Sequence, residues 1–281
     1  MANSIHAGID VGSTTTKAVI ADDDAIVLAS AIAPTGVNSR KTAERLLSEA
    51  LESCGRSRED LRCTVSTGYG RRLIGFADRV VSEITAIARG ASGHGRSHLT
   101  NGAMLRTAID IGGQDSKVIA LDESGILRDF IMNDKCAAGT GRFLEVMARA
   151  LEVELDQLGE LSLRAAKVLP VNSLCTVFAE SEVISLLSCG ENMSDIIAGV
   201  HASIAKRLAA MARKVGVHEP VAFVGGPALN VGLRRALQDE LGVPLLVPEQ
   251  PQLVAAYGAA VIAAGMQPAP RPGKMNDGRE D

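Results

Sequence analysis

The chain contains 281 residues, of which 46% are hydrophobic and 22% are charged, and its formal net charge is −4. This composition excludes wholesale disorder, and without an excess of Lys and Arg it excludes a typical nucleic-acid-binding surface. Aromatic residues make up only 2% of the chain, too few for base-stacking platforms. We expect a cytoplasmic protein without membrane segments. Residues 1–6 form a short polar stretch rather than a signal peptide, and the longest apolar run, residues 253–266, falls short of the roughly 20 residues that span a bilayer.

A motif near the start of the chain occurs twice. Residues 8–17 read GIDVGSTTTK, and residues 108–117 read AIDIGGQDSK, aligned without a gap. Asp10 and Lys17 of the first copy match Asp110 and Lys117 of the second. Self-similarity at a fixed offset is typical of a repeated structural unit, so we expect duplicated halves.

Each copy predicts three short strands connected by turns, with no helix after the glycine-rich turn. A Walker P-loop needs the spacing G-x-x-x-x-G-K-[ST] and a following helix, so this motif is not one. We expect two glycine-rich hairpins instead, whose backbone N–H groups and hydroxyls bind a polyphosphate from opposite sides. The predicted strands are residues 5–10, 17–21 and 26–32 in the first copy and residues 105–111, 117–121 and 126–132 in the second.

The spacing of apolar side chains predicts helices in much of the remaining chain. A strand over residues 221–224 runs into a turn at Gly225 and Gly226 that precedes a further helix. From residue 267 onward the chain is rich in proline and charge, which predicts a disordered tail. The predicted helices include residues 38–54, 143–151, 195–215 and 253–266.

Two hairpins followed by a Gly-Gly turn resemble the actin, sugar-kinase and heat-shock-chaperone superfamily of ATPases. The resemblance implies an α/β protein with a duplicated actin-like (ribonuclease H-like) fold and a nucleotide cleft between two subdomains. These subdomains are expected at residues 1–101 and 102–266, with the helix at 253–266 packed back on the first subdomain and residues 267–281 as the tail. The implied ligands are ATP or ADP and Mg²⁺.

The same resemblance implies roles for the polar residues of the hairpins. The hairpins hold the β- and γ-phosphates, Asp10 and Asp110 position Mg²⁺ or its waters, and Gln114 positions a water or the γ-phosphate. These three are the expected catalytic residues, and two separated aspartates suffice because Mg²⁺ retains several waters. We interpret Asp22 and Asp115 as turn or surface residues. The expected nucleotide contacts are Gly12, Ser13, Thr14, Thr15, Thr16, Lys17, Gly112, Gly113, Gly225, Gly226, Asn230 and Gln252.

Two of the five cysteines stand in unusual surroundings. Cys136 lies in a glycine-rich turn just before a predicted helix, and Cys175 lies at the start of another. The positive end of a helix favours a thiolate, which suits a redox disulfide, a nucleophile or half of a four-thiolate metal site. In the last case a twofold dimer would supply four thiolates, the number that a cubane iron–sulfur cluster needs. We interpret the other candidates as structural: Cys54, Cys63 and Cys189 as buried hydrophobic residues, and His94 and His98 as part of a loop.

The segments around these two cysteines resemble a narrower family. Residues 132–143 read MNDKCAAGTGRF and residues 175–184 read CTVFAESEVI. Both look like segments of the ATP-dependent activator proteins of 2-hydroxyacyl-CoA dehydratases and of the related ATPase subunits of benzoyl-CoA reductase. The likeness covers residues 5–264, nearly the whole chain. This sequence departs from the family near Leu229, where members often carry a polar residue, so the base contacts are less well defined than the phosphate site.

The resemblance implies a homodimer, or a pseudo-dimer, that shares one [4Fe–4S] cluster held by Cys136 and Cys175 of each protomer. The implied activity is ATP-dependent transfer of one electron from reduced ferredoxin or flavodoxin to a partner 2-hydroxyacyl-CoA dehydratase. The alternative partner is a benzoyl-CoA reductase component. Two further functions stay open: a small-metabolite kinase of the same superfamily, with Glu180 or Glu182 as its base, and a nucleotide-gated assembly module with structural cysteines.

Overall fold

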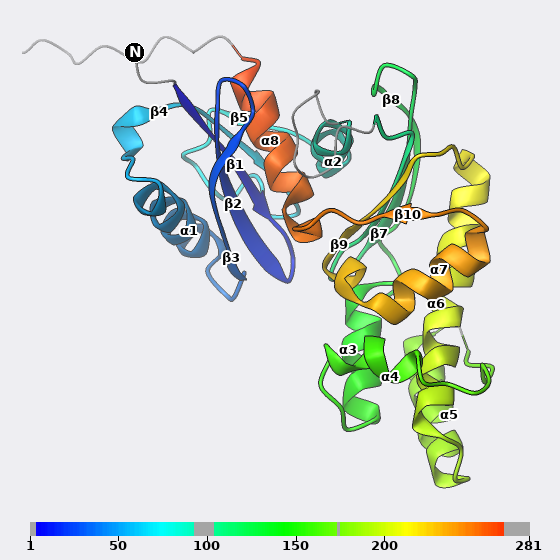
Figure 1. The fold of residues 1–281 in the computed structure, drawn as a ribbon. Helices are drawn as coiled ribbons and strands as arrows, with labels where there is room; N and C mark the ends of the chain where they lie inside the picture. Colours follow the sequence, from blue (N-terminus) through cyan, green and yellow to red (C-terminus); the bar gives the residue numbers. More distant parts are fainter. Residues whose placement is uncertain (1–3, 93–103, 173–174, 267–281) are drawn as a thin grey trace, which may run out of the picture.

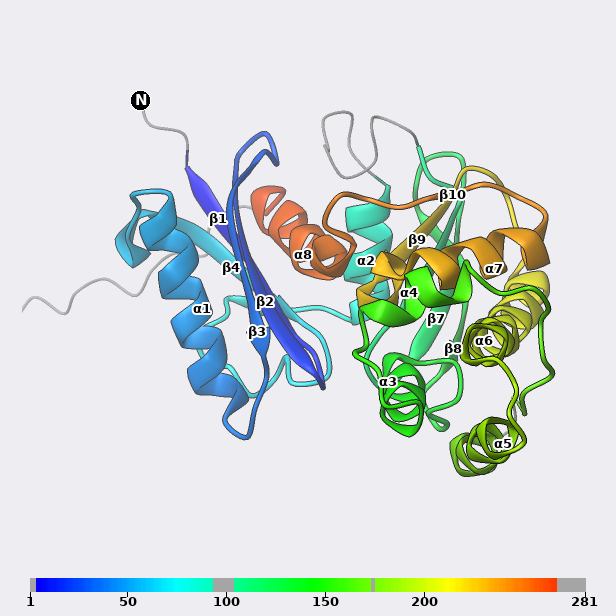
Figure 2. The same cartoon turned by 60° about the horizontal axis from the view of Figure 1, so that its bottom comes forward.

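The computed structural model describes residues 4–92, 104–172 and 175–266. Figures 1 and 2 show two α/β bodies, one on each side of a central pair of helices. Each body is built on a five-stranded sheet that contains both antiparallel and parallel strand pairs. The predictions for His94, for His98 and for the tail at 267–281 lie outside the described residues.

The first sheet has the strand order β3-β2-β1-β4-β5. Its first three strands form an antiparallel meander, and the last two join in parallel. The strands are β1 (Ile5–Val11), β2 (Thr15–Asp22), β3 (Val27–Pro34), β4 (Leu61–Thr67) and β5 (Arg79–Val80).

The second sheet repeats this topology in the order β10-β9-β6-β7-β8. Asp10 lies opposite Lys17 in the register of β1 and β2, and Asp110 lies opposite Lys117 in the register of β6 and β7. The duplicated α/β architecture predicted from the repeated motif is therefore confirmed. The strands are β6 (Thr107–Ile111), β7 (Ser116–Leu121), β8 (Leu127–Asn133), β9 (Val221–Gly225) and β10 (Leu245–Leu246).

Helices cover both faces of the first sheet. Helix α1 (Ser39–Ser53) packs on β2 and β3, while α8 (Val254–Ala264) packs on β1, β2 and β4. Helix α2 (Glu83–Ala91) lies between α8 and the second sheet (Figure 2). In α2, the side chain of Ile87 belongs to the same hydrophobic cluster as Ile119 of β7. Helix α2 therefore packs with the second sheet, although its residues fall within the range 1–101.

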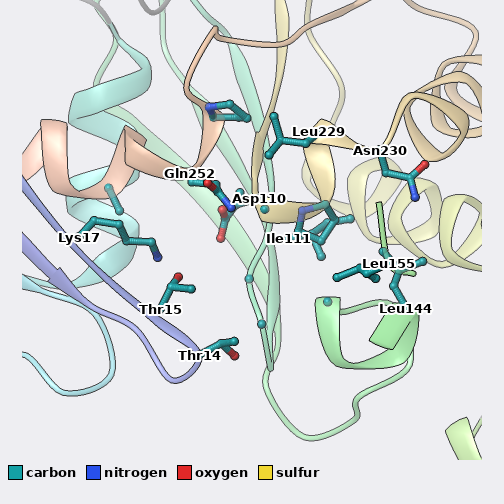
Figure 3. Close-up of a pocket in the computed structure, with 18 of the residues that line it drawn as sticks. Thr14, Thr15, Lys17, Asp110, Ile111, Leu144, Leu155, Leu229, Asn230 and Gln252 are labelled. Carbon is teal, nitrogen blue, oxygen red and sulfur yellow. The ribbon is translucent and has the colours of Figure 1, made fainter. Parts of the chain in front are cut away.

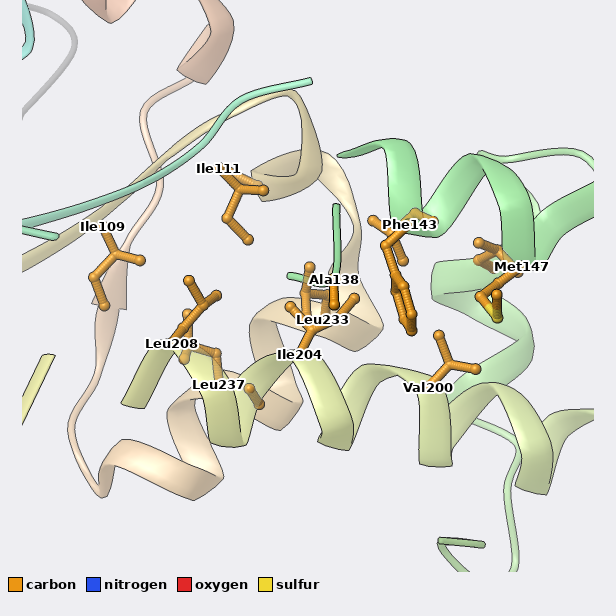
Figure 4. Close-up of a cluster of buried hydrophobic side chains, with 14 of the residues drawn as sticks. Ile109, Ile111, Ala138, Phe143, Met147, Val200, Ile204, Leu208, Leu233 and Leu237 are labelled. Carbon is orange, nitrogen blue, oxygen red and sulfur yellow. The ribbon is translucent and has the colours of Figure 1, made fainter. Parts of the chain in front are cut away.

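The second body has its largest core between its sheet and the helices α3 to α7. Figure 4 shows Phe143 and Met147 of α3 (Gly141–Ala150) facing Val200 and Ile204 of α6 (Met193–Val215). Leu233 of α7 (Val231–Leu241) joins the same core. The remaining helices are α4 (Gln157–Ser162) and α5 (Thr176–Ser188), with 3₁₀ turns at η1 (Arg58–Asp60), η2 (Gly226–Leu229) and η3 (Pro251–Leu253).

Helix α8 is in contact with backbone on both of its sides. A methyl group on Gly258 would overlap the carbonyl oxygen of Ala86 in α2, and one on Gly8 of β1 would overlap the carbonyl oxygen of Ala256. Glycine is the residue that permits such close approach. The helix is therefore buried nearly all round, which explains its apolar sequence. Among the described helices, none has both the length and the apolar character that crossing a membrane requires.

We predict that Gly258→Ala destabilises the protein by about 1–3 kcal/mol, because the added methyl group forces α2 and α8 apart. Urea unfolding followed by circular dichroism measures the change. Gly75→Ala is the matched control, because a methyl group there would meet no atom within 4 Å. Equal free energies of unfolding for the two variants would show that α2 and α8 accommodate the added methyl group without a loss of stability.

Candidate functional site

A cavity of about 580 Å³ opens between the two hairpins, the Gly-Gly turn and the start of α8 (Figure 3). This volume is in the range of small-molecule and cofactor sites. Both copies of the repeated motif contribute to its lining, as predicted for a cleft between duplicated halves. The predicted residues that line it are Asp10, Thr14, Thr15, Lys17, Asp110, Gly112, Gly113, Gly225, Gly226, Asn230 and Gln252.

Four predicted residues lie outside this lining: Gly12, Ser13, Thr16 and Gln114. Thr16 is fully buried, and its Oγ1 lies 2.9 Å from Oγ1 of Thr35, because alternation along β2 turns it to the face opposite Thr15. Thr16 therefore does not face the cavity, although we predicted it as a nucleotide contact. The backbone N–H of Gly12 donates a hydrogen bond of 3.1 Å to the Thr15 carbonyl and so closes the first hairpin. Ser13 and Gln114 are exposed.

The tips of the two hairpins touch each other. A methyl group on Gly113 of the second hairpin would overlap Oγ1 of Thr14 in the first. Glycine at this position therefore allows the two bodies to close on the cavity from opposite sides.

The first hairpin holds a buried ion pair. Lys17 Nζ donates to Asp10 Oδ2 over 2.9 Å, and both side chains are largely buried. Burial by itself lowers the pKa of Lys17, but the Asp10 charge and hydrogen bond outweigh it, so the pKa is raised. The other oxygen, Asp10 Oδ1, is buried and has no hydrogen-bond partner among the described residues. This oxygen is enclosed beside Gly68, while Asp10 as a residue lines the cavity. A carboxylate with an unsatisfied oxygen at such a place fits a metal ion or a metal-bound water.

The second hairpin holds a larger cluster around Lys117, which is 1% exposed. Its Nζ lies 2.7 Å from Asp115 Oδ1, 3.2 Å from Glu83 Oε1 and 3.3 Å from Asp110 Oδ2. Asp115 is thus the nearest partner of a buried lysine. It does lie in the hairpin turn, where its carbonyl accepts from Gly112 N–H, but its side chain is not the solvated surface group that we also considered. Asp22 does act as a turn residue, because its Oδ1 accepts from the backbone N–H of Ile26.

Sequence reasoning missed Glu83. It is the first residue of α2, which begins after the N-cap Ser82, and only the packing of α2 against the second sheet brings it to Lys117. A serine followed by an acidic residue indicates the start of a helix, but no local signal links that helix to the repeated motif. The residue therefore belongs to the site through tertiary structure alone.

The cluster perturbs its own protonation. Burial raises the pKa of Glu83 from 4.5 to about 7, against the lowering effect of Lys117, and burial also raises the pKa of Asp110. Burial lowers the pKa of Lys117, but three neighbouring carboxylates more than compensate and raise it. The oxygens of Glu83, Asp110 and Asp115 lie within 4.8 Å of one another, a spacing suited to shared binding of one cation.

The opposite end of the cavity carries apolar side chains, although the charged Glu154 and Asp156 flank one of them in the lining. Figure 3 shows Leu229 on one side and Leu155 on the other, and they are 57% and 46% exposed. Asn230 also lines this end, but its Oδ1 accepts from Leu233 N over 2.8 Å and its Nδ2 lies 3.1 Å from Nε2 of His201. Burial lowers the pKa of His201 to about 4, so the imidazole is neutral and accepts from Asn230.

The two predicted cluster cysteines differ in their surroundings. Cys175 is the N-cap residue of α5, as predicted. Cys136 lies in the connection between β8 and α3, and α3 begins at Gly141, so the prediction of a glycine-rich turn before a helix is confirmed for Cys136. The structure forms no disulfide among the five cysteines, all of which are described.

The remaining candidate residues agree only in part with the burial and the location that we predicted for them. Cys63 is buried and Cys54 half-buried, but Cys189 is exposed at the end of α5, so our interpretation of Cys189 as a buried residue is wrong. Glu180 and Glu182, the bases considered for a kinase, lie outside the cavity lining. Glu182 instead accepts a hydrogen bond of 2.6 Å from the backbone N–H of Asn172.

Comparison with known proteins identifies close relatives along nearly the whole chain. The BadF/BadG/BcrA/BcrD ATPase family matches residues 7–263. The activator of lactoyl-CoA dehydratase from Anaerotignum propionicum is 47% identical over 91% of this chain and 96% of its own. A benzoyl-CoA reductase subunit from Thauera aromatica is 32% identical over 90% of this chain and 87% of its own.

Two solved structures share the fold. The crystal structure of (R)-2-hydroxyglutaryl-CoA dehydratase component A from Acidaminococcus fermentans has a TM-score of 0.87 and 44% identity, covering 93% of this chain and 98% of its own. The activator of 2-hydroxyisocaproyl-CoA dehydratase from Clostridium difficile, with bound ADPNP, has a TM-score of 0.84 and 42% identity, covering 93% and 94%. The actin-like fold predicted from the sequence is confirmed.

We predict that Glu83 makes the nucleotide-free protein less stable as the pH rises. Its pKa is higher in the folded state than its ordinary value of 4.5, so its stabilising contribution is complete below pH 4.5 and is lost as the pH passes about 7. Urea unfolding between pH 5 and 8 should show a decline in the free energy of unfolding that Glu83→Gln flattens. The difference should be on the order of a few kcal/mol. Parallel declines in both proteins would contradict the assignment.

Proposed function

The chain belongs to the BadF/BadG/BcrA/BcrD ATPase family, and we propose that it hydrolyses ATP to drive single electrons into a partner 2-hydroxyacyl-CoA dehydratase. The observation that carries this proposal is the cavity between two matched hairpins in a chain that also presents Cys136 and Cys175. Similarity to proteins named as dehydratase activators supports the choice of partner. A benzoyl-CoA reductase component is the second candidate partner, supported by the lower identity to the Thauera aromatica protein.

In this proposal the triphosphate binds at the hairpin end of the cavity. Thr14 and Thr15 offer hydroxyls, and the second hairpin offers the backbone N–H of Gly113 from the other side. The N–H of Gly112 is used within the hairpin, where it donates to the Asp115 carbonyl over 2.9 Å. The base and ribose extend past Gly225 and Gly226 toward the apolar end. A related activator with bound ADPNP supports a nucleotide in this fold.

The acidic groups of the site divide two tasks between them. Asp10 and Asp110 orient Mg²⁺ or its waters, which would neutralise phosphate charge when bound. Glu83 is suited to accept a proton from the attacking water, because its pKa of about 7 lies near the working pH. Gln114 is exposed at the tip of the second hairpin and lies outside the cavity lining, and its proposed role is to position a water or the γ-phosphate from there.

The cysteines fit an iron–sulfur cluster that two copies of the chain would share. A [4Fe–4S] cluster needs four thiolates, and Cys136 and Cys175 provide two, so a homodimer supplies the full set. Both cysteines are half-buried, and the helices that follow them, α3 and α5, pack against each other. When bound, the cluster supplies reversible storage of one electron, which we propose comes from reduced ferredoxin or flavodoxin.

In this proposal, electron transfer is coupled to ATP hydrolysis, and this coupling is the purpose of the nucleotide site. For one electron, a tenfold change in equilibrium corresponds to about 59 mV, so a conformational free energy of several kcal/mol shifts an effective potential substantially. The kinase alternative is less favoured, because Glu180 and Glu182 do not line the cavity. The structure offers nothing that favours the assembly module over the ATPase.

We predict that Asp10→Asn and Asp110→Asn each reduce ATP turnover at least about a hundredfold, because each removes a carboxylate that positions the metal. Phosphate release by the full chain with MgATP measures the rate. Asp239→Asn is the control, because Asp239 is exposed on α7, outside this cavity. Unchanged turnover in either site variant would exclude that aspartate as a metal-positioning group.

We also predict that Cys136→Ser and Cys175→Ser lose the iron and the visible absorption of the protein purified or reconstituted without oxygen, while both remain folded. Cys189→Ser should keep them, because Cys189 is exposed at the far end of α5. Iron analysis and light scattering report cluster content and dimer formation. A full cluster in either of the first two variants would overturn the ligand assignment.

A further inference from the structure

A single side chain shapes the loop that carries Cys136. The loop comprises residues 134–140, between the end of β8 and the start of α3, and we call it the Cys136 loop. Asn133, the last residue of β8, donates through Nδ2 to the carbonyl of Cys136 over 2.8 Å and to that of Ala138 over 3.2 Å. Both N–H groups of one amide thus hold the loop in its present shape.

The other end of the loop is tied to the second phosphate hairpin. The backbone N–H of Gly141 donates to the carbonyl of Gly112 over 2.9 Å, and that of Arg142 donates to the carbonyl of Gly113 over 2.8 Å. Groups at the start of a helix lack partners within the helix, and here the hairpin provides them. The start of α3 and the hairpin therefore move together.

Asn133 is also next to the hairpin through the sheet. In the register of β7 and β8, Asn133 lies opposite Ser116, the residue at which the chain leaves the hairpin and enters β7. The Cys136 loop is consequently attached to the hairpin on both sides, through Asn133 at its beginning and through α3 at its end.

Nucleotide phosphates would act directly on this hairpin. Gly112 and Gly113 line the cavity, and Gly113 lies against Thr14 of the first hairpin with no room for a methyl group. Phosphates that bind both hairpins set the separation between them. A displaced second hairpin carries the start of α3 and the Cys136 loop with it, because backbone hydrogen bonds join them.

Cys175 is held differently. Its N–H donates to Oδ1 of Asn172 over 3.4 Å, and its carbonyl accepts from the N–H of Ala179 over 3.0 Å. These bonds stay within residues 172–179 and do not reach either hairpin.

We infer that Asn133 is a positioning residue that couples the Cys136 loop to the second phosphate hairpin, so that the nucleotide in the cavity is sensed at Cys136 more strongly than at Cys175. This inference rests on the proposed function only in requiring that ATP binds. It concerns the residues of the loop and holds with or without a cluster.

Thiol alkylation tests the inference in the full chain freed of iron. The protein is treated with iodoacetamide in the presence of MgATP, MgADP or Mg²⁺ alone, and the rates at Cys136, Cys175 and Cys189 are measured by peptide mass spectrometry. Calorimetry on the same samples measures ATP affinity. The exposed Cys189 serves as the internal control in every sample.

In the wild-type chain we expect MgATP to change the Cys136 rate at least about threefold, with smaller changes at Cys175 and Cys189. In Asn133→Asp, a side chain of equal size that cannot donate to the two carbonyls, the Cys136 response should fall to that of Cys189 while ATP affinity stays within about twofold. Asn38→Ala, which removes the N-cap side chain of α1, should respond as the wild type does.

ATP binding with equal responses at Cys136 and Cys175 overturns the inference and leaves the proposed ATPase intact. A full Cys136 response in Asn133→Asp overturns the role of Asn133. Absence of ATP binding to the wild-type chain overturns the proposed function itself. The wild-type comparison needs no variant, so the inference stays testable even if Asn133→Asp does not fold.

Discussion

Two buried lysines, each placed opposite an aspartate by strand register, make the cleft possible. Lys17 pairs with Asp10 across β1 and β2, and Lys117 pairs with Asp110 across β6 and β7. A buried carboxylate without a counter-charge is strongly destabilising. The lysines therefore allow aspartates to be buried near the ends of β1 and β6. In the proposed function, a nucleotide with its metal would offer replacement partners of both signs: the metal for the carboxylates and the phosphates for Lys17, which lines the cavity.

Helix α2 connects this electrostatic arrangement to the packing between the two bodies. Its first residue, Glu83, pairs with Lys117, while Gly90 farther along the same helix packs against the backbone of α8. Because α8 in turn rests on the first sheet through Gly8, α2 and α8 form a continuous backbone contact from one sheet to the other. A change in the angle between the bodies therefore also changes the position of the carboxylate with the strongly raised pKa.

The sequence predicted the parts of the site that depend on local pattern. The repeated motif placed Asp10 and Asp110 at equivalent strand ends, and the Gly-Gly turn placed Gly225 and Gly226 beside them. Local pattern failed where tertiary structure decides. Glu83 reaches the cavity only because α2 packs on the second sheet, and Asp115 turns inward only because Lys117 is buried beside it.

Residue type and spacing also misled at the first hairpin. The hydroxyl run at residues 13–16 suggests four equal phosphate contacts, but strand alternation sends Thr16 to the opposite face of the sheet, against Thr35. A hydrogen bond to a residue outside the motif thus accompanies the side chain that faces away from the cavity. The segment after Cys136 does follow its local pattern, because it forms a turn, closed by Asn133, before α3 begins at Gly141.

The two cysteines are anchored differently, and this difference bears on how ATP would influence electron transfer in the proposed function. Cys136 follows a hairpin that lines the cavity, whereas the backbone groups of Cys175 bond to Asn172 and Ala179 among the described residues. In the proposed cluster, a nucleotide would then move Cys136 of each protomer relative to Cys175 instead of moving both cysteines as a rigid unit. Hydrogen bonds to the ligands, burial and solvent exposure set the reduction potential of iron–sulfur sites. In the proposed function, a single hairpin movement would alter both the surface that the partner meets and the driving force of electron transfer, so one nucleotide site would suffice for both tasks.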